Sequence, residues 1–165
     1  MRVITGSARG RKLITPEGMD TRPTTDMVKE AVFSTIQFIV PYSNVLDLFA
    51  GSGQLGIEAL SRGAQFASFV DNSNDSVKIC NENVKTAGFE GVSQVLRRDA
   101  DAFLSSCNEK FDIAFLDPPY KAGLLETSAL KVTEKMKDSG IIICEHPLDE
   151  VLPEEFNGFT LFRNY

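Results

Sequence analysis

The sequence has only three cysteines and one histidine among its 165 residues. Cys80, Cys107 and Cys144 lie far apart and form no C-x-x-C pair, and His146 alone does not complete a zinc site with them. These absences argue against a disulfide framework and against metal-dependent chemistry. They indicate reduced thiols in a cytoplasmic protein.

Long apolar stretches are also missing. No run approaches the roughly 18 consecutive apolar residues that a membrane-spanning helix needs, and residues 1–6 include no apolar stretch long enough for a signal peptide. Hydrophobic residues make up 42% of the chain and charged residues 24%, which is typical of a globular domain that needs no disulfide or metal. We therefore expect a single globular domain with neither a membrane nor a metal as partner.

Charge is unevenly distributed along the chain. Residues 1–29 hold six basic and three acidic residues, a balance of +3, whereas residues 30–165 carry −9. The net charge of −6 argues against a general affinity for nucleic acid, but the basic N-terminal arm, residues 1–23, is predicted to bind phosphates locally. The basic residues of this arm are Arg2, Arg9, Arg11, Lys12 and Arg22.

The chain divides into three parts within one domain. Strand-like segments at 3–5 and 12–15 flank a turn, which predicts a β-hairpin within residues 1–23. Apolar residues at helical spacing then predict an amphipathic helix over 24–40, with Lys29 and Glu30 on its solvated face. Residues 44–165 form the third part, an α/β core.

Strand and helix patterns alternate through this core. The predicted strands cover 44–49, 66–71, 93–98, 111–117, 140–145 and 159–163, and the predicted helices cover 54–62, 73–87, 100–107 and 124–137. Repeated βα units with apolar strands predict an α/β, Rossmann-like fold with a doubly wound, mostly parallel sheet. Because the sixth strand pattern lies next to Tyr165, the chain is expected to be truncated or to lack a final strand.

A glycine-rich turn follows the first strand of the core. Gly51, Gly53 and Gly56 have the spacing G-x-G-x-x-G, and glycines here let the backbone approach a nucleotide cofactor closely. Asp71 ends the next strand, 20 residues after Gly51, where a carboxylate accepts hydrogen bonds from a ribose. Taken alone, this motif also fits a dinucleotide.

Asp47 separates the two nucleotide interpretations. A carboxylate at the end of the first strand, four residues before Gly51, would repel a pyrophosphate arriving at the helix N-terminus. It suits S-adenosylmethionine, which carries an ammonium group and a sulfonium but no phosphate. The charge of Asp47 therefore favours S-adenosylmethionine over NAD.

A second motif, Asp117-Pro118-Pro119-Tyr120, ends the fourth strand. Its prolines fix a stiff turn without N–H donors, so that its carbonyls and the carboxylate of Asp117 offer only acceptors. Tyr120 adds an aromatic face on which a base can stack. This combination suits the exocyclic amino group of a planar ring, which makes Asp117, Pro118 and Tyr120 the predicted catalytic residues.

The two motifs together resemble class I S-adenosylmethionine-dependent methyltransferases that act on amino groups. The chain resembles the RsmD family more closely, whose members methylate the exocyclic N2 amine of a guanine in bacterial small-subunit (16S) ribosomal RNA. The resemblance extends from Met1 to about Glu145. It is carried by Gly10-Arg11-Lys12-Leu13, Arg22-Pro23-Thr24-Thr25-Asp26, Leu48-Phe49-Ala50-Gly51-Ser52-Gly53, Leu55-Gly56-Ile57-Glu58-Ala59-Leu60-Ser61-Arg62-Gly63 and Asp117-Pro118-Pro119-Tyr120.

This resemblance implies the parts of the binding site. The methionine moiety of the cofactor would lie against Asp47, Phe49, Gly51, Ser52 and Gly53, the ribose against Asp71 and Asn72, and the adenine against Asp99 and Ala100, with Thr24 and Thr25 beside them. Asp99 is also placed to cap the helix that begins at Ala100. The target guanine would turn out of the RNA stack onto Tyr120, and the basic arm would hold phosphates of ribosomal RNA or of the small ribosomal subunit.

Three other functions remain open from the sequence. The chain could be another amino methyltransferase, with DNA adenine, another RNA or a protein glutamine as substrate. It could be a NAD-dependent oxidoreductase that uses the Gly51 loop, against which Asp47 argues. The third is an S-adenosylmethionine-binding module without catalytic activity.

Overall fold

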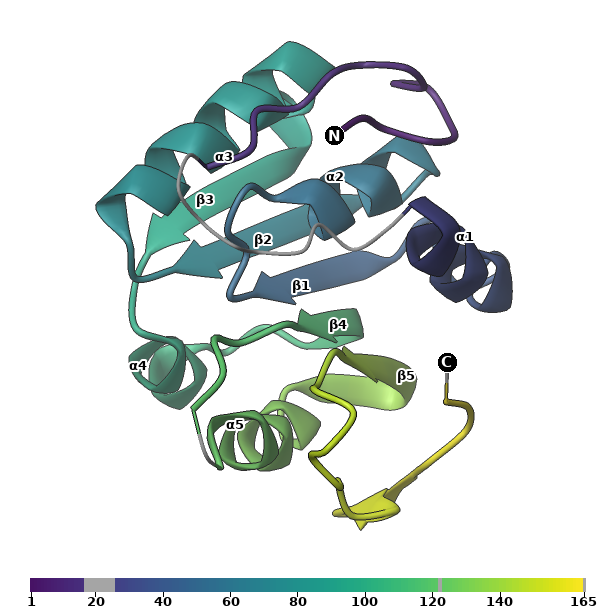
Figure 1. Ribbon diagram of the computed structural model, residues 1–165, viewed down its shortest axis with the longest axis vertical. Helices are drawn as coiled ribbons and strands as arrows, with labels where there is room; N and C mark the ends of the chain where they lie inside the picture. The colour runs from purple at the N-terminus through teal and green to yellow at the C-terminus, as the bar shows by residue number, and fades with distance from the viewer. Residues whose placement is uncertain (17–25, 122, 165) are drawn as a thin grey trace.

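The computed structural model describes residues 1–16, 26–121 and 123–164 (Figure 1). Within these residues the main sheet has the strand order β3-β2-β1-β4-β5, and all neighbouring strands run parallel. Its strands are β1 (Asn44–Leu48), β2 (Phe66–Asp71), β3 (Ser93–Arg97), β4 (Phe111–Leu116) and β5 (Met136–Cys144). The helices between them are α2 (Gln54–Ser61), α3 (Asn74–Ala87), a short 3-10 turn (Glu90–Val92), α4 (Ala100–Ser106) and α5 (Leu124–Thr133). The predicted doubly wound, parallel α/β fold is confirmed.

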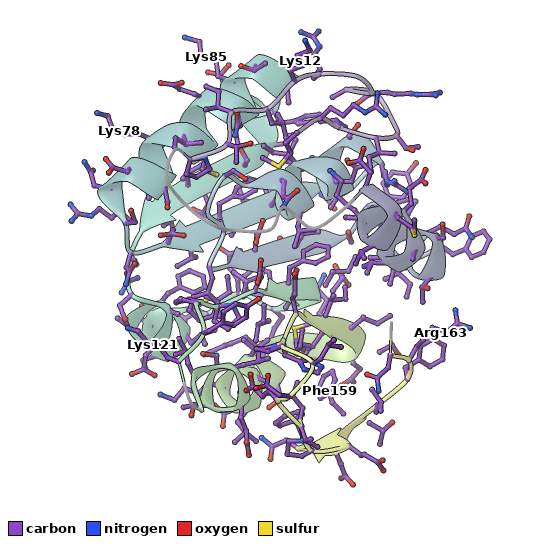
Figure 2. All side chains as sticks on the ribbon, viewed as in Figure 1. Lys12, Lys78, Lys85, Lys121, Phe159 and Arg163 are labelled. Carbon is purple, nitrogen blue, oxygen red and sulfur yellow. The ribbon has the colours of Figure 1, made fainter. Side chains whose placement is uncertain are left out.

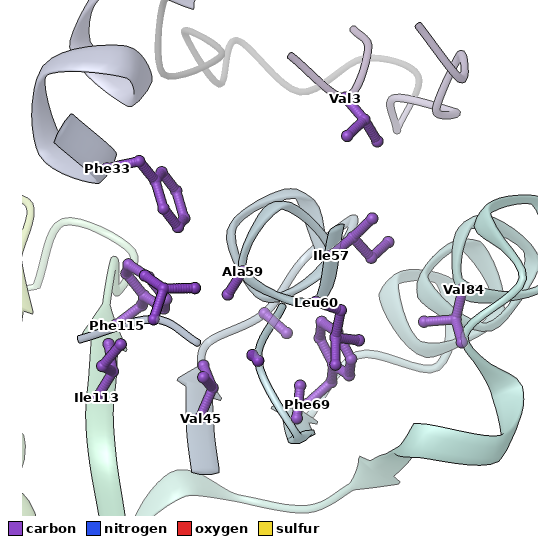
Figure 3. Close-up of a cluster of buried hydrophobic side chains, with 14 of the residues drawn as sticks. Val3, Phe33, Val45, Ile57, Ala59, Leu60, Phe69, Val84, Ile113 and Phe115 are labelled. Carbon is purple, nitrogen blue, oxygen red and sulfur yellow. The ribbon is translucent and has the colours of Figure 1, made fainter. Parts of the chain in front are cut away.

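Side chains that alternate along the strands build two hydrophobic cores, one on each face of the sheet. On one face, α1 (Asp26–Thr35), α2 and α3 pack over a cluster that includes Val45 and Phe115. Figure 3 shows Phe33 of α1 above Phe115 of β4, and the two ring centroids are 5.6 Å apart. On the other face, α4 and α5 cover a second cluster that includes Leu46 and Leu48. Both faces of β1 are therefore buried.

The described part of the N-terminal arm, residues 1–16, runs across α2 and α3 (Figure 1). The predicted hairpin is present as a single antiparallel bridge between Arg2 and Lys12 rather than as two full strands. The helix expected to reach residue 40 ends at Thr35, because the chain then enters turns in which the N–H groups of Ile39 and Val40 both donate to the carbonyl of Ile36.

The expected solvated position of Lys29 is wrong. Lys29 is 1% exposed, and its Nζ atom donates to the carbonyl of Arg2 at 3.0 Å and lies 3.6 Å from Glu58 Oε2. Glu58 is also fully buried, accepts two backbone N–H groups of the arm and pairs with Arg62 at 2.9 Å. These charges are buried because they satisfy one another, and they fasten the arm and α1 to α2.

The strand predicted over 159–163 does not join the main sheet. Only β7 (Phe159–Thr160) forms there, and it pairs antiparallel with β6 (Glu155–Phe156). Asn157 and Gly158 between them have φ values of 47° and 89°, the left-handed conformations that a tight Asn-Gly hairpin turn requires. The hairpin lies on α5, where Asn157 Nδ2 donates to Thr133 Oγ1 at 3.0 Å.

No helix among the described residues is long and apolar enough to cross a membrane.

Candidate functional site

The strand order reverses between β1 and β4, because the chain extends from β1 to β3 on one side and then returns to add β4 and β5 on the other. Doubly wound sheets bind ligands at the carboxyl ends of the strands at such a switch point. Leu48 of β1 lies level with Leu116 of β4, so Phe49 and Asp117 leave the sheet at the same edge. Asp71 ends the neighbouring strand β2.

The loop from β1 to α2 turns sharply at this edge. Phe49, Gly51 and Gly53 have φ values of 69°, 55° and 82°, a left-handed conformation that glycine tolerates and phenylalanine adopts only under strain. A Cβ atom on Gly53 would approach Cys80 Sγ to 2.7 Å, so that packing against α3 requires this glycine. A Cβ atom on Gly51 would meet no atom within 4 Å, so the backbone at Gly51 is open to a ligand.

Asp47 is a buried carboxylate directly beneath this loop. It is 3% exposed, and its Oδ2 atom accepts the N–H of Gly56 at 3.0 Å. Burial raises the pKa of Asp47 to about 8 against the opposing effect of this hydrogen bond, and the charges of Asp117 and Asp71 contribute in the same direction as burial. A cationic ligand group would relieve the repulsion among these three carboxylates.

Asp71 connects the glycine loop to the end of β2. One carboxylate oxygen accepts the N–H of Gly51 at 2.9 Å, and the other accepts the N–H of Ser73 at 2.9 Å. Each oxygen keeps a further lone pair for a ligand hydroxyl. The predicted ribose-binding residue therefore also holds the loop in place, and Asn72 follows it directly.

Asp117 begins the turn after β4, and its side chain is exposed. Enough protein nevertheless surrounds its carboxyl group that burial raises the pKa of Asp117 to about 7, with the charge of Glu145 as the second cause. Glu145 follows the neighbouring strand β5, and its N–H donates to the carbonyl of Leu116 at 2.9 Å. Pro118 is buried, whereas Tyr120 is 78% exposed and presents its ring at the surface.

Asp99 is the N-cap of α4, since its Oδ1 atom accepts the N–H of Ala102 at 3.1 Å. The capping role anticipated for Asp99 is therefore present, and the contact of Asp99 and Ala100 with adenine stays a prediction.

The cations of the arm face solvent. Arg9, Arg11 and Lys12 are exposed, and Arg2 is exposed beside Asp26, with 3.7 Å between their charged groups. Figure 2 shows Lys12 at the outer rim of the molecule near Lys85 of α3, and Arg11 Nη1 contacts the Thr86 carbonyl at the end of the same helix at 3.5 Å. Arg22, Thr24 and Thr25 lie outside the described residues.

Known proteins match this chain over its full length. The family model described as Conserved hypothetical protein 95 matches residues 1–165. The chain belongs to this family. Its resemblance to the RsmD family is confirmed by Ribosomal RNA small subunit methyltransferase D of Escherichia coli (strain K12), which is 34% identical over 99% of this chain and 83% of the relative.

Two further proteins resemble this RsmD-family chain. YlbH of Bacillus subtilis (strain 168), which its name assigns provisionally to the rRNA methyltransferases, is 40% identical over 99% of this chain and 91% of its own length. The solved structure of yhhF from Escherichia coli, described provisionally as a methyltransferase, has a TM-score of 0.89 and 34% identity over 99% of this chain and 90% of that chain.

Sequence reasoning about this RsmD-family chain missed two polar residues near the site. Glu145 directly follows β5 and acts on the charge of Asp117, and the rule that identified Asp71 and Asp117, an acidic residue at a strand's carboxyl end, would also have found Glu145. Asn83 is 1% exposed on α3 and touches the loop at Ser52, which no sequence pattern indicates. Among the described residues, no three His, Cys, Asp or Glu side chains are arranged to hold a metal ion.

Proposed function

We propose that this chain transfers a methyl group from S-adenosylmethionine to the exocyclic N2 amine of a guanine in bacterial small-subunit (16S) ribosomal RNA. One observation carries the proposal. The glycine loop after Leu48 and the Asp117-Pro118-Pro119-Tyr120 turn after Leu116 lie at the same edge of the sheet, at its switch point. The family relative from Escherichia coli named for the small-subunit RNA supports this substrate. A ribosomal RNA substrate, as free RNA or within the small subunit, places the reaction in the cytoplasm.

The residues present fit this cofactor. Asp47 is buried, accepts the N–H of Gly56 and has a raised pKa, which suits an ammonium group above it. Open space at Gly51 leaves room for the methionine moiety, with Phe49, Ser52 and Gly53 completing that part of the site. Asp71 and Asn72 would hold the ribose, Asp99 and Ala100 the adenine, and Thr24 and Thr25 the side of the cofactor. When bound, S-adenosylmethionine supplies an electrophilic methyl group.

The Asp117 turn positions the amine of the target base. Asp117 and the Pro118 carbonyl accept hydrogen bonds from N2–H, and Tyr120 stacks on the guanine ring. The nitrogen lone pair forms the new bond to the methyl carbon while the bond from that carbon to sulfur breaks, and the surplus proton leaves through the Asp117 carboxylate to solvent. Positioning and local electrostatics supply most of the rate.

The three parts of the single domain divide the work. Residues 44–165 bind the cofactor and the target base, and the second part, residues 24–40, which includes α1, supports them. The basic arm, residues 1–23, contacts RNA phosphates through Arg2, Arg9, Arg11, Lys12 and Arg22. These contacts position the RNA without reading its sequence.

The test is methyl transfer with labelled S-adenosylmethionine to small-subunit RNA from cells that lack the gene, followed by mass spectrometry of the nucleosides. We expect label in N2-methylguanosine with the native chain and none with Asp117→Ala. Label in DNA adenine with no label in RNA, or hydride transfer with NAD, would contradict the proposal.

A further inference from the structure

A buried amide joins the basic arm to the glycine loop. Asn83 of α3 is 1% exposed, and its Oδ1 atom accepts the N–H of Ile14 at 2.7 Å. Its Nδ2 atom donates to the carbonyl of Ile14 at 3.0 Å and to the carbonyl of Ser52 at 2.9 Å. Both hydrogens of the amide are therefore used, one toward the arm and one toward the loop.

The orientation of this amide is fixed by its partners. The N–H of Ile14 requires an oxygen opposite it, whereas the two carbonyls require hydrogens, so a flipped amide would lose all three bonds. Any displacement of Ile14 would leave a buried donor and a buried acceptor without partners, which is unfavourable. Asn83 consequently favours one position of Ile14 relative to Ser52.

Ser52 of the glycine loop also contacts the arm directly. Its Oγ atom lies 4.0 Å from Met1 Sδ, and the carbonyl of Met1 accepts the N–H of Leu13. Residues 1 and 14, at the two ends of the paired part of the arm, therefore both lie near the glycine loop. Arg9 and Arg11 lie at the turn between them. The contacts of the arm with Glu58 and Ser61 are made to the body of α2 rather than to the glycine loop.

We propose that Asn83 is a positioning residue that couples the arm to the glycine loop, so that RNA bound to the arm and cofactor bound at the loop strengthen each other's binding. The inference rests on the proposed function, which assigns RNA to the arm and S-adenosylmethionine to the loop. Coupling between two sites is reciprocal, so RNA raises cofactor affinity by the factor by which cofactor raises RNA affinity.

The experiment measures that factor. Equilibrium dialysis with labelled S-adenosylhomocysteine, with and without saturating 16S ribosomal RNA, measures how much RNA raises the affinity for the cofactor product. Filter binding of the RNA, with and without S-adenosylhomocysteine, measures how much that ligand raises the affinity for RNA. For the native chain we expect both to show an increase in affinity of about fivefold or more. For Asn83→Ala we expect a factor near one, even where each ligand alone still binds.

Asn81→Ala is the matched control. Asn81 lies on the same helix but is exposed, and its Nδ2 atom donates a hydrogen bond to the carbonyl of Val77 in that helix. Its replacement should therefore leave the increase in affinity as large as in the native chain. A folded Asn83→Ala variant with the native factor would overturn the proposal. So would a native chain that binds both ligands independently. A native chain that binds no S-adenosylhomocysteine would contradict the proposed function itself and this inference with it.

Hydrogen exchange on the native chain tests the coupling without any variant. The Ile14 amide hydrogen donates to Asn83, so its exchange reports on this bond. Saturating S-adenosylhomocysteine should slow the exchange of that amide severalfold while leaving the amide of Ser7, which donates to Ser61 on α2, unchanged. Equal exchange at Ile14 with and without the ligand would contradict the proposal.

Discussion

The carboxylate of Asp47 accepts the backbone N–H of Gly56 at 3.0 Å, so the end of β1 and the first turn of α2 are joined by a buried acid. This bond fixes the course of the glycine loop between them. Burial also raises the pKa of Asp47 to about 8, so that a positive ligand group beside it would change its protonation near neutral pH. One side chain thus serves the fold and, in the proposed function, the cofactor.

Binding of S-adenosylhomocysteine should strengthen as pH rises toward 8. The cofactor-free chain holds a proton on Asp47 below a pKa of about 8, and an ammonium group favours the carboxylate, so binding releases that proton. Affinity should therefore fall by up to about tenfold for each pH unit below 8. Calorimetry in buffers of different ionisation enthalpy counts the released proton.

Asp47→Asn separates the charge from the hydrogen bond, because the amide oxygen still accepts the N–H of Gly56. We expect weak, pH-independent binding. Because its pKa is raised in the folded state, the contribution of Asp47 to the stability of the cofactor-free chain is fully present below about pH 4 and is lost as pH rises to about 8. The variant should escape this loss and melt at a higher temperature than the native chain at pH 8. The expected shift is about 2–4 °C for each kcal/mol by which the free energy of unfolding differs. Native affinity in the variant would contradict the role assigned to Asp47.

The rate of methyl transfer should depend on Asp117. Its carboxylate form accepts N2–H and the leaving proton, so with its pKa raised to about 7 the single-turnover rate should rise with pH and level off above 7. Asp117→Ala should lose about 100-fold or more, and Asp117→Asn should keep a reduced rate without the rise. Because the side chain is exposed, its replacement creates no cavity, and melting temperatures should not fall. Near-normal activity in Asp117→Ala would show that the turn is only structural.

Tyr120 should act through its ring rather than its hydroxyl. The side chain is 78% exposed, so its removal creates no cavity. Tyr120→Ala should weaken the stacking of the target base by about 1–3 kcal/mol, whereas Tyr120→Phe should remain close to native. Methyl transfer at saturating S-adenosylmethionine, measured against RNA concentration, distinguishes the two. Equal losses in both variants would indicate that the hydroxyl matters instead.

The sequence predicted what local patterns and strand ends determine. The strand over 66–71 has the predicted bounds because its apolar run is bounded by polar residues, and Asp71 and Asp117 were found because parallel strands bring their carboxyl ends to one edge. Lys29 was misplaced because its burial depends on Glu58, a residue 29 positions away whose approach no periodicity reports. Asn83 was missed for the same reason, since its partners lie 69 and 31 positions distant.

The arm should provide salt-dependent affinity for RNA. Arg9, Arg11 and Lys12 are exposed, so replacing all three with alanine should flatten the dependence of log affinity on log salt by up to about 0.7–0.9 for each phosphate group that the variant no longer binds. Filter binding across a salt series measures the slope. Lys110→Ala with Lys137→Ala, at the opposite edge of β4 and β5, removes two cations away from the arm and should leave the slope nearly native. An unchanged slope in the triple variant would mean that these cations do not bind RNA.

In the buried pair of Glu58 and Lys29, the glutamate should contribute more to the stability of the chain than the lysine. Glu58→Gln removes the carboxylate that lies 3.6 Å from the buried Nζ atom of Lys29, so we expect a loss of about 3–5 kcal/mol in the free energy of unfolding. Lys29→Met keeps the unbranched stem of the side chain without its terminal ammonium group and so removes the cation whose pKa burial lowers, while Glu58 keeps Arg62 and its two backbone donors. That variant should lose less, about 1–2 kcal/mol for the hydrogen bond to Arg2. Urea unfolding gives both values from shifts of the midpoint at constant slope. A greater loss in Lys29→Met than in Glu58→Gln would show that the lysine, rather than the glutamate, holds the arm to the domain.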